Sequence, residues 1–301
     1  MEQEIIALIR ERGPLTGSEI MEAVGGDSLI LWRTCKLSEN LVTQTVGTRY
    51  MRLDRRIKGF ARLSPSILRE FLTYSVVGLT QQDAQLTQKI QSVASHIKAI
   101  SKAKSELAYR IVSALFDRLG SELPIQDQVC FILGGDVVYN MAHDVPRPER
   151  STGKLVNGSD MDLIVVVTDD FPNELVERID KAIYQEKHRL LITPHLREEI
   201  DYIVKDLDRI RGQVKFDTFK HMVACKLLHE GTFLYGSEDL FHSIRAMLKE
   251  HGVVQKLSAL EERAKNFRNE AEDLLLKGTD SKIQGESQYL FYPTEESEEF
   301  E

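Results

Sequence analysis

The 301-residue sequence contains little cysteine, proline or tryptophan. Its three cysteines, Cys35, Cys130 and Cys225, are far apart and match neither a zinc-ligand spacing nor a redox pair. No apolar run approaches the ~20 residues that a membrane span needs, and no signal-peptide pattern opens the chain. These absences argue against a disulfide scaffold, a zinc module and a membrane protein. We therefore expect a cytoplasmic protein with buried, reduced thiols.

Positive charge is scarce overall but concentrated in one region. The formal net charge of −8 argues against a surface that binds nucleic acid everywhere. Residues 31–70, however, contain nine Lys or Arg against three acids. The last seven residues, EESEEFE, contain five glutamates, and this composition is typical of a disordered, solvated tail.

The first 78 residues have the pattern of a helical unit with two strands. Apolar spacing predicts three helices, and Thr16 with Glu19 forms a capping-box pattern at the start of the second. Two strands joined around Gly47 follow. This order resembles a winged helix-turn-helix domain. The expected elements are helices near residues 5–9, 16–24 and 27–38, and strands at residues 41–46 and 49–53.

The resemblance to a winged helix places cations on the third helix and in or after the wing. One interpretation is a platform for DNA or RNA, whose phosphates these cations contact. The other is a protein-interaction or dimerisation module, in which the same cations form a solvated face. Both alternatives stay open. The candidate nucleic-acid-binding residues are Arg33, Lys36, Arg49, Arg52 and Arg55.

A long helical pattern runs from about Thr80 to Leu119. Its apolar positions repeat at 4-3 spacing with only Lys104 interrupting, and a similar stripe occurs in residues 257–274. We expect the two stripes to share one hydrophobic seam, formed either by antiparallel helices within a chain or by the long helix in a homodimer. The apolar positions of the long helix are Leu86, Ile90, Val93, Ile97, Ile100, Leu107, Ile111 and Ala114.

The most informative stretch joins a glycine turn to an acidic pair. An apolar run ends at Gly134 and Gly135, and Asp160 and Asp162 lead into a β-branched run typical of a strand buried on both faces. Side chains alternate along a strand, so both carboxylates point the same way. Two carboxylates there are costly unless they hold cations. Magnesium prefers such oxygen ligands.

These residues resemble the DNA polymerase β-like nucleotidyltransferase superfamily over roughly residues 129–205. The resemblance implies two Mg²⁺ ions, a nucleoside triphosphate substrate, and transfer of a nucleotidyl group with release of pyrophosphate. It also implies a mixed sheet that carries the site. The nucleotide-binding candidates are Gly134, Gly135, Ser159 and Lys154.

Two features depart from the superfamily pattern. Residues 145–157 form an inserted loop, whose cations Arg147 and Lys154 could neutralise a triphosphate. Asp136 follows the glycines, where a small or hydroxyl residue is commoner and where a triphosphate would pass. A carboxylate caps a helix N-terminus favourably but repels a phosphate bound at the same place.

A third carboxylate is expected beside Asp160 and Asp162, which are the primary catalytic and metal-binding candidates. Residues 198–211 fit a helix, whereas residues 199–204 also fit a strand that presents Asp201 to the site. The resemblance favours the strand, which makes Asp201 the third catalytic residue and metal ligand. Asp217 is the next candidate.

The sequence thus predicts an α+β protein. We expect a magnesium-dependent nucleotidyltransferase that moves a nucleoside monophosphate to a hydroxyl acceptor. The alternative is a non-enzymatic regulator that binds nucleic acid or protein and carries a degenerate transferase domain. The expected segments are a winged-helix domain at 1–78, a long connecting helix at 79–120, the nucleotidyltransferase domain at 121–240, and a C-terminal helical segment with the acidic tail at 241–301.

Overall fold

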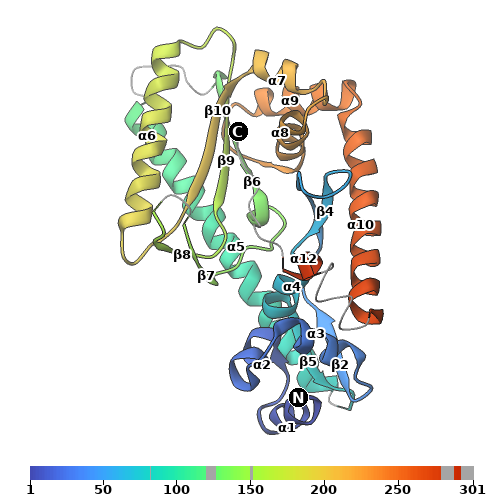
Figure 1. Ribbon diagram of the computed structural model, residues 1–301. Coiled ribbons are helices and arrows are strands. Elements are labelled where there is room, and N and C mark those ends of the chain that lie inside the picture. The colour runs from blue at the N-terminus through green and yellow to red at the C-terminus, as the bar shows by residue number, and fades with distance from the viewer. Residues whose placement is uncertain (82, 120–126, 150–151, 279–287, 293–301) are drawn as a thin grey trace. The chain divides into compact units, whose positions relative to one another are not determined.

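The computed structural model describes residues 1–81, 83–119, 127–149, 152–278 and 288–292. The fold is α+β, as predicted, and its contacts divide the chain into two compact units (Figure 1). Among the described residues, unit 1 comprises residues 1–96 and 259–292, and unit 2 comprises residues 97–258. The predicted acidic tail lies outside the described residues. Within those residues, no helix has the length and apolar character needed to cross a bilayer.

Unit 1 begins with three helices, as the apolar spacing predicts. The helix at residues 17–24 has the expected capping box, in which the Thr16 hydroxyl accepts from the Glu19 amide and the Glu19 carboxylate accepts from the Thr16 amide. The elements are α1 (Glu2–Arg12), β1 (Leu15–Thr16), α2 (Gly17–Val24), α3 (Ser28–Leu37), β2 (Leu41–Thr45), β3 (Tyr50–Leu53), β4 (Ala61–Ser64), α4 (Ile67–Tyr74), β5 (Ser75–Leu79) and α12 (Gln288–Phe291).

The predicted hairpin between residues 41–46 and 49–53 is wrong. Strand β2 pairs antiparallel with β5, in a sheet of order β1-β5-β2, whereas β3 pairs antiparallel with β4. The register places Thr43 opposite Val77. The β3–β4 hairpin and α4 are therefore inserted between two paired strands, and the turn at Gly47 does not join partners.

A buried ion network joins α4 to α10 (Val253–Lys277) within unit 1. Glu70 is 4% exposed, accepts two hydrogen bonds from Arg49 at 2.6 and 2.7 Å, and lies 3.1 Å from Nη2 of Arg268. Glu272 contacts both arginines at 2.5 and 2.9 Å. Burial disfavours the Glu70 carboxylate, but the arginine contacts outweigh it, and the pKa of Glu70 falls below its ordinary value. Arg49 is thus committed to carboxylates of its own chain.

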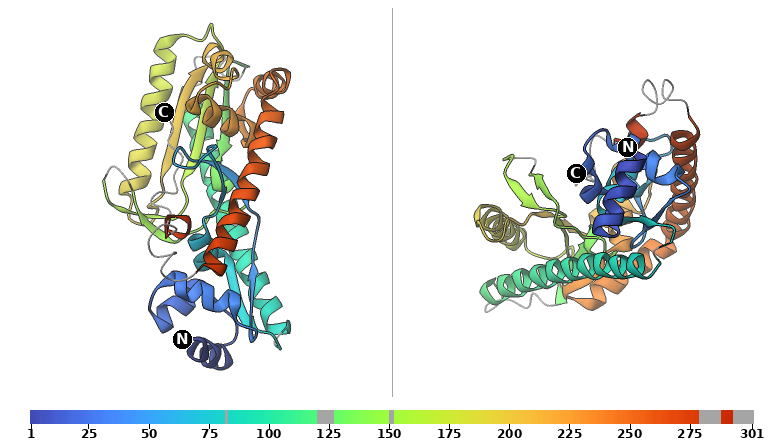
Figure 2. Two further views of the ribbon diagram at one scale, coloured as in Figure 1. Left: turned by 45° about the vertical axis from the view of Figure 1, so that its right-hand side comes forward. Right: turned by 90° about the horizontal axis from the view of Figure 1, so that it is seen from below.

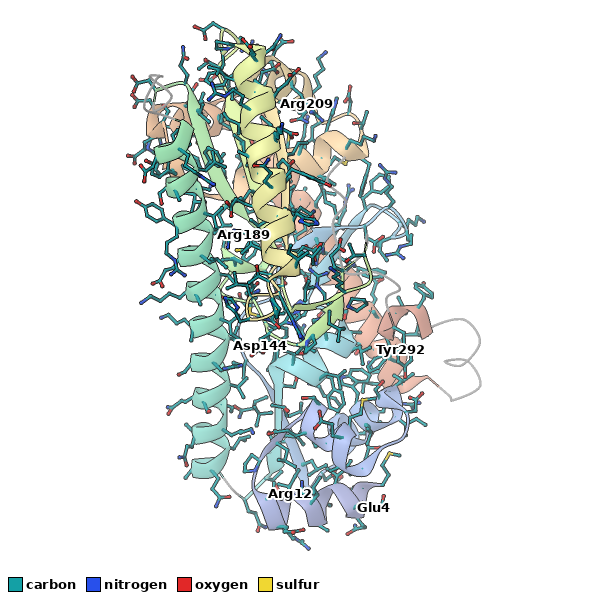
Figure 3. The ribbon with its side chains drawn as sticks, turned by 90° about the vertical axis from the view of Figure 1, so that its left-hand side faces the viewer. Glu4, Arg12, Asp144, Arg189, Arg209 and Tyr292 are labelled. Carbon is teal, nitrogen blue, oxygen red and sulfur yellow. The ribbon has the colours of Figure 1, made fainter. Side chains whose placement is uncertain are left out.

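The core of unit 1 includes the C-terminal residues of the described chain. The Phe291 ring lies 5.5 Å from that of Trp32, and the Tyr292 hydroxyl donates to Asp27, the N-cap of α3, at 3.0 Å (Figure 3). Ala271 of α10 packs into this core. Ile111, which the predicted seam paired with the stripe containing Ala271, packs instead into the core of unit 2. The seam is therefore not formed by these residues; a homodimer through the long helix stays a prediction.

Unit 2 is built on a four-stranded mixed sheet of order β10-β9-β6-β11 (Figure 1). Strands β10 and β9 are parallel, and the other neighbours are antiparallel. Two long helices, α5 and α10, cross the boundary between the units. The remaining elements are α5 (Asp83–Leu119), β6 (Val129–Gly134), the 3₁₀ turn η3 (Gly135–Val137), β7 (Pro146–Pro148), β8 (Leu155–Asn157), β9 (Met161–Val167), α6 (Asn173–Ile192), β10 (Ile200–Asp206), α7 (Leu207–Gln213), α8 (Phe219–Glu230), β11 (Thr232–Gly236) and α9 (Glu238–Glu250).

The two faces of this sheet have different partners. One face packs against α5 and α6 and includes Leu163, Val165 and Ile200. Because side chains alternate, Asp162 and Asp201 belong to the opposite face. That face is the side of α8, whose Leu227 side chain lies next to Gly134. Helix α6 ends at Ile192, with Thr193 as its C-cap.

The buried stripe of α5 departs from the predicted 4-3 spacing toward its C-terminus. Ala114 is exposed, whereas Ala108, Val112 and Leu115 are buried. A straight helix of 3.6 residues per turn drifts ~20° per heptad, so a heptad pattern leaves the buried face after a few turns. Lys104, which interrupts the pattern, is 3% exposed, donates to the carbonyl of Asn157 at 2.8 Å and forms an ion pair with Glu198.

A second buried lysine lies between the sheet and α7. Lys205 of β10 is 5% exposed, and its ammonium donates to the Gln213 side chain at 3.2 Å. Burial and, to a lesser extent, the charge of Arg209 (Figure 3) lower the pKa of Lys205, and Cys225 opposes them; together they bring it from 10.5 to about 8. Cys225 also donates to the backbone carbonyl of Gln213 at 3.3 Å.

We expect Lys205→Met to stabilise the protein at pH 7 by about 2 kcal/mol, which is the cost of the lowered pKa less one lost hydrogen bond. The unfolded chain keeps the ordinary pKa of 10.5 and binds more protons than the folded chain above pH 8, so the wild type recovers stability as the pH rises toward 10. The advantage of the variant should shrink over that range in urea unfolding.

The quantity to compare is the difference in free energy of unfolding between Lys205→Met and the wild type at each pH. Burial raises the pKa of Cys35 and Cys130 from 9.0 to about 12, which destabilises wild type and variant alike above pH 9. Lys181→Met, on the exposed side of α6, is the control and should change neither the free energy of unfolding at pH 7 nor its dependence on pH. A stability difference that does not vary with pH would show that Lys205 titrates normally.

Candidate metal centre

Three carboxylates gather at one edge of the unit 2 sheet. Asp160, Asp162 and Asp201 each offer a ligand atom, and these atoms all lie within 4.8 Å of one another. Asp201 is opposite Asp162 in the parallel register of β10 and β9, and Asp160 directly precedes β9. Residues 200–206 are therefore a strand, as the resemblance favours, and the helix begins only at Leu207. Such a cluster could hold a metal ion.

The glycine turn lies beside the same cluster. Gly134 ends β6 opposite Asp162, on the side away from Asp201. Gly135 has φ +71°, and a Cβ atom there would lie 2.0 Å from Oδ2 of Asp162. Neither the backbone conformation nor the space accommodates a side chain at Gly135. The turn therefore determines where the Asp162 carboxylate lies.

Ser159 and Asp136 are engaged with each other next to this turn. The Ser159 hydroxyl donates to Asp136 at 2.9 Å and accepts from the His143 amide at 3.2 Å. Ser159 is 4% exposed. Asp136 lies in a single 3₁₀ turn, Gly135–Val137. The Asp136 carboxylate thus has a hydrogen-bond donor from its own chain.

Two cations and a fourth acid complete the surroundings of the cluster. Nη2 of Arg147, on β7, lies 2.8 Å from Glu199 and 3.5 Å from Asp160, and Nζ of Lys187, on α6, lies 2.7 Å from Asp201. Burial raises the pKa of Glu199 to about 7; Arg147 opposes this shift, and the charges of Asp160 and Asp201 add to it. The cluster is therefore partly neutralised by the chain itself.

Sequence analysis missed Glu199 and Lys187. Glu199 could have been found, because Glu199 and Asp201 have the same two-residue spacing as Asp160 and Asp162 and share a strand face. Nothing in the sequence marks Lys187, which comes from a helix and meets Asp201 only through the fold. Arg147 was noted only as a cation of the inserted loop.

Two of the predicted residues lie elsewhere. Lys154 is exposed on the β7–β8 hairpin (light green in the right-hand view of Figure 2) and lines a cavity with Leu191 and Arg197. Asp217 is exposed and lies 2.6 Å from Nδ1 of His221. Asp217 does not belong to the acidic cluster found among the described residues.

The candidate nucleic-acid-binding residues all belong to unit 1. Lys36 is exposed on α3, and Arg55 is exposed in the turn after β3. Arg52 is half-buried on β3. Arg33 donates to the carbonyl of Gly278 at 3.0 Å, and Arg49 lies in the ion network of Glu70. Lys36 and Arg55 are thus the best placed of the five to meet a phosphate.

Comparison with known proteins leaves this geometry as the basis for inferring function. No model of a known protein family matches the chain, and a search of curated proteins finds no significant match. The three aspartates, the glycine turn and the adjoining cations are therefore the observations from which a function is proposed.

Proposed function

We propose that the protein is a divalent-cation-dependent nucleotidyltransferase of the DNA polymerase β-like superfamily. It would transfer a nucleoside monophosphate from a nucleoside triphosphate to a hydroxyl acceptor and release pyrophosphate. The observation that carries the proposal is the cluster of Asp160, Asp162 and Asp201 on adjacent parallel strands, with a glycine turn against its central member.

The donor set suits a hard divalent cation. All three groups are carboxylates, which Mg²⁺ prefers over nitrogen or sulfur ligands. The side chains of Asp160 and Asp201 are 23% and 30% exposed, so solvent and a triphosphate can supply further oxygen ligands. Gly135 leaves space that any side chain would take from Asp162.

Each residue of the cluster has a role in this proposal. Asp160 and Asp162 would hold both cations, and Asp201 would complete the ligands of one and receive the proton of the acceptor hydroxyl at a carboxylate oxygen. When bound, two divalent cations supply charge neutralisation on the attacking and leaving oxygens of an in-line displacement. The backbone at Gly134 and Gly135 would let the phosphates approach closely.

The role of Asp201 leads to a contrast between two variants. Asp201→Asn keeps the size of the side chain but removes its charge, so turnover should fall by about a hundredfold or more while triphosphate affinity changes little. Asp217→Asn, outside the cluster, should be nearly silent. Incorporation of α-labelled triphosphate into acceptor measures both. Equal turnover in the two variants, or loss only in Asp217→Asn, would contradict the assignment.

For unit 1, we propose a winged-helix variant that binds nucleic acid through α3. The element order α1-β1-α2-α3-β2, closed by β5 in the sheet β1-β5-β2, supports the first part. The exposed Lys36 on α3 supports the second. The chain between β2 and β5 would then be an enlarged wing.

We expect Lys36→Glu to weaken the binding of DNA or RNA by the full chain and to reduce the slope of log affinity against log salt by about one. Arg10→Glu, an exposed reversal on α1, is the control and should leave both values unchanged. Fluorescence anisotropy across a salt series measures them. Binding that does not respond to salt, or none at low salt, would favour a protein-interaction module.

A further inference from the structure

Two side-chain ammonium or guanidinium groups already contact the acidic cluster. Lys187 reaches Asp201 from α6, and Arg147 reaches Asp160 and Glu199 from β7. They belong to different elements and meet different aspartates. A lysine and an arginine of the chain therefore already compensate part of the negative charge that a divalent cation would compensate.

The two cations are held differently. Nε of Arg147 donates to the carbonyl of Gly158 at 2.7 Å, which fixes its guanidinium beside the turn that precedes β9. Lys187 donates from its Nζ to Asp201 at 2.7 Å, at the end of a flexible four-carbon stem. Both side chains are about one-quarter exposed, at 27% and 26%. Ion pairs with this access to water contribute little to stability, so they can be exchanged for other partners.

We propose that Arg147 and Lys187 are positioning residues that compete with divalent cations for the aspartates of the metal centre. This inference rests on the proposed function. With no metal bound, the two side chains hold the carboxylates together against their mutual repulsion. When metal binds, each must give up its aspartate, so the chain sets the cation concentration at which the centre fills. A triphosphate bound with the metal would offer the displaced cations new anionic partners.

The competition is measured with Mn²⁺ alone, by electron paramagnetic resonance of the free ion and without nucleotide. Lys187→Gln removes one competing charge, so the dissociation constant for Mn²⁺ should fall by about thirtyfold, the effect in water of a unit positive charge about 4 Å from a doubly charged cation. Arg147→Gln should act in the same direction. The conservative variants Lys187→Arg and Arg147→Lys keep the charge and should stay close to the wild type.

Lys181→Gln controls for loss of a positive charge on the same helix, because Lys181 is exposed on α6 and outside the cluster. It should leave Mn²⁺ affinity unchanged. If Arg147→Gln fails to fold, as circular dichroism would show, Lys187→Gln and Lys187→Arg decide the question. Unchanged or weaker Mn²⁺ binding by Lys187→Gln would overturn the proposal.

Failure of this inference is distinguishable from failure of the proposed function. If the wild type and these variants bind Mn²⁺ with the same affinity, the metal centre is supported and only the competition is contradicted. If neither the wild type nor any variant binds Mn²⁺, both the metal centre and the competition are contradicted. Binding seen only after Lys187→Gln or Arg147→Gln would support the competition in its strongest form.

Discussion

Replacing Asp162 with alanine is expected to reduce nucleotidyl transfer by at least about a thousandfold, since catalytic cations supply several kcal/mol of transition-state stabilisation. Asp162 is the central member of the cluster, with Asp201 opposite it on one neighbouring strand and Gly134 on the other. The two carboxylates that remain are paired with Arg147 and Lys187. Turnover at saturating magnesium and triphosphate measures the loss.

Asp169→Ala is the matched control for Asp162→Ala. Asp169 follows the opposite end of β9 and pairs with Arg211 at the surface. Its removal should change turnover by no more than about twofold. Magnesium should raise the melting temperature of the wild type and of Asp169→Ala, because it binds the folded state, but not that of Asp162→Ala. Equal turnover in the two variants would exclude Asp162 from the site.

Gly135→Ala should reduce turnover by about a hundredfold in a protein that still folds, because a displacement of about 1 Å at a catalytic group has that cost. The new Cβ would lie 2.0 Å from Oδ2 of Asp162, so the carboxylate must move. The φ of +71° adds backbone strain of about 1–2 kcal/mol. Turnover and thermal stability should be measured on the same preparations.

Gly153→Ala separates these two effects. Gly153 has φ +67°, nearly that of Gly135, but nothing lies within 4 Å of a Cβ placed there. Gly153→Ala should therefore lose only the stability that backbone strain costs, and only Gly135→Ala should lose most of its turnover. Equal losses of turnover, or none in Gly135→Ala, would show that contact between the turn and Asp162 does not matter.

The centre of the fold could be predicted because its signals are local. The β-branched run after Asp162 is typical of a strand buried on both faces, and it forms β9. Asp201 was ambiguous from periodicity alone, since its neighbours fit both a helix and a strand. The parallel pairing with β9 decides in favour of the strand, and it brings Asp201 opposite Asp162.

The partner of β2 could not be predicted, because it lies far along the chain. Thr43 pairs with Val77, after an intervening hairpin and helix. A turn at Gly47 between two short strands indicates a hairpin by local rules. Those rules do not include the later strand β4, which pairs with β3 and places Leu63 opposite Met51. Pairing is decided by the whole sheet.

The cations of the site show the same limit. Arg147 and Lys187 come from a hairpin and a helix that the sequence places before and after β9, and only the folded sheet brings both to the aspartates. In the sequence, Lys104 is only an interruption of an apolar stripe. It is a buried residue with a carboxylate and a carbonyl as partners, which no spacing rule could supply.

Transfer of a nucleotidyl group is tested most directly by following the two ends of the triphosphate separately. The protein would be incubated with Mg²⁺, cell extract as a source of acceptor, and each triphosphate labelled at the α or the γ phosphorus. The proposal predicts α label on an acceptor and γ label in pyrophosphate, with wild-type protein and not with Asp162→Ala. Label from the γ phosphorus on the acceptor, or no more α label on an acceptor with the wild type than with Asp162→Ala, would contradict it.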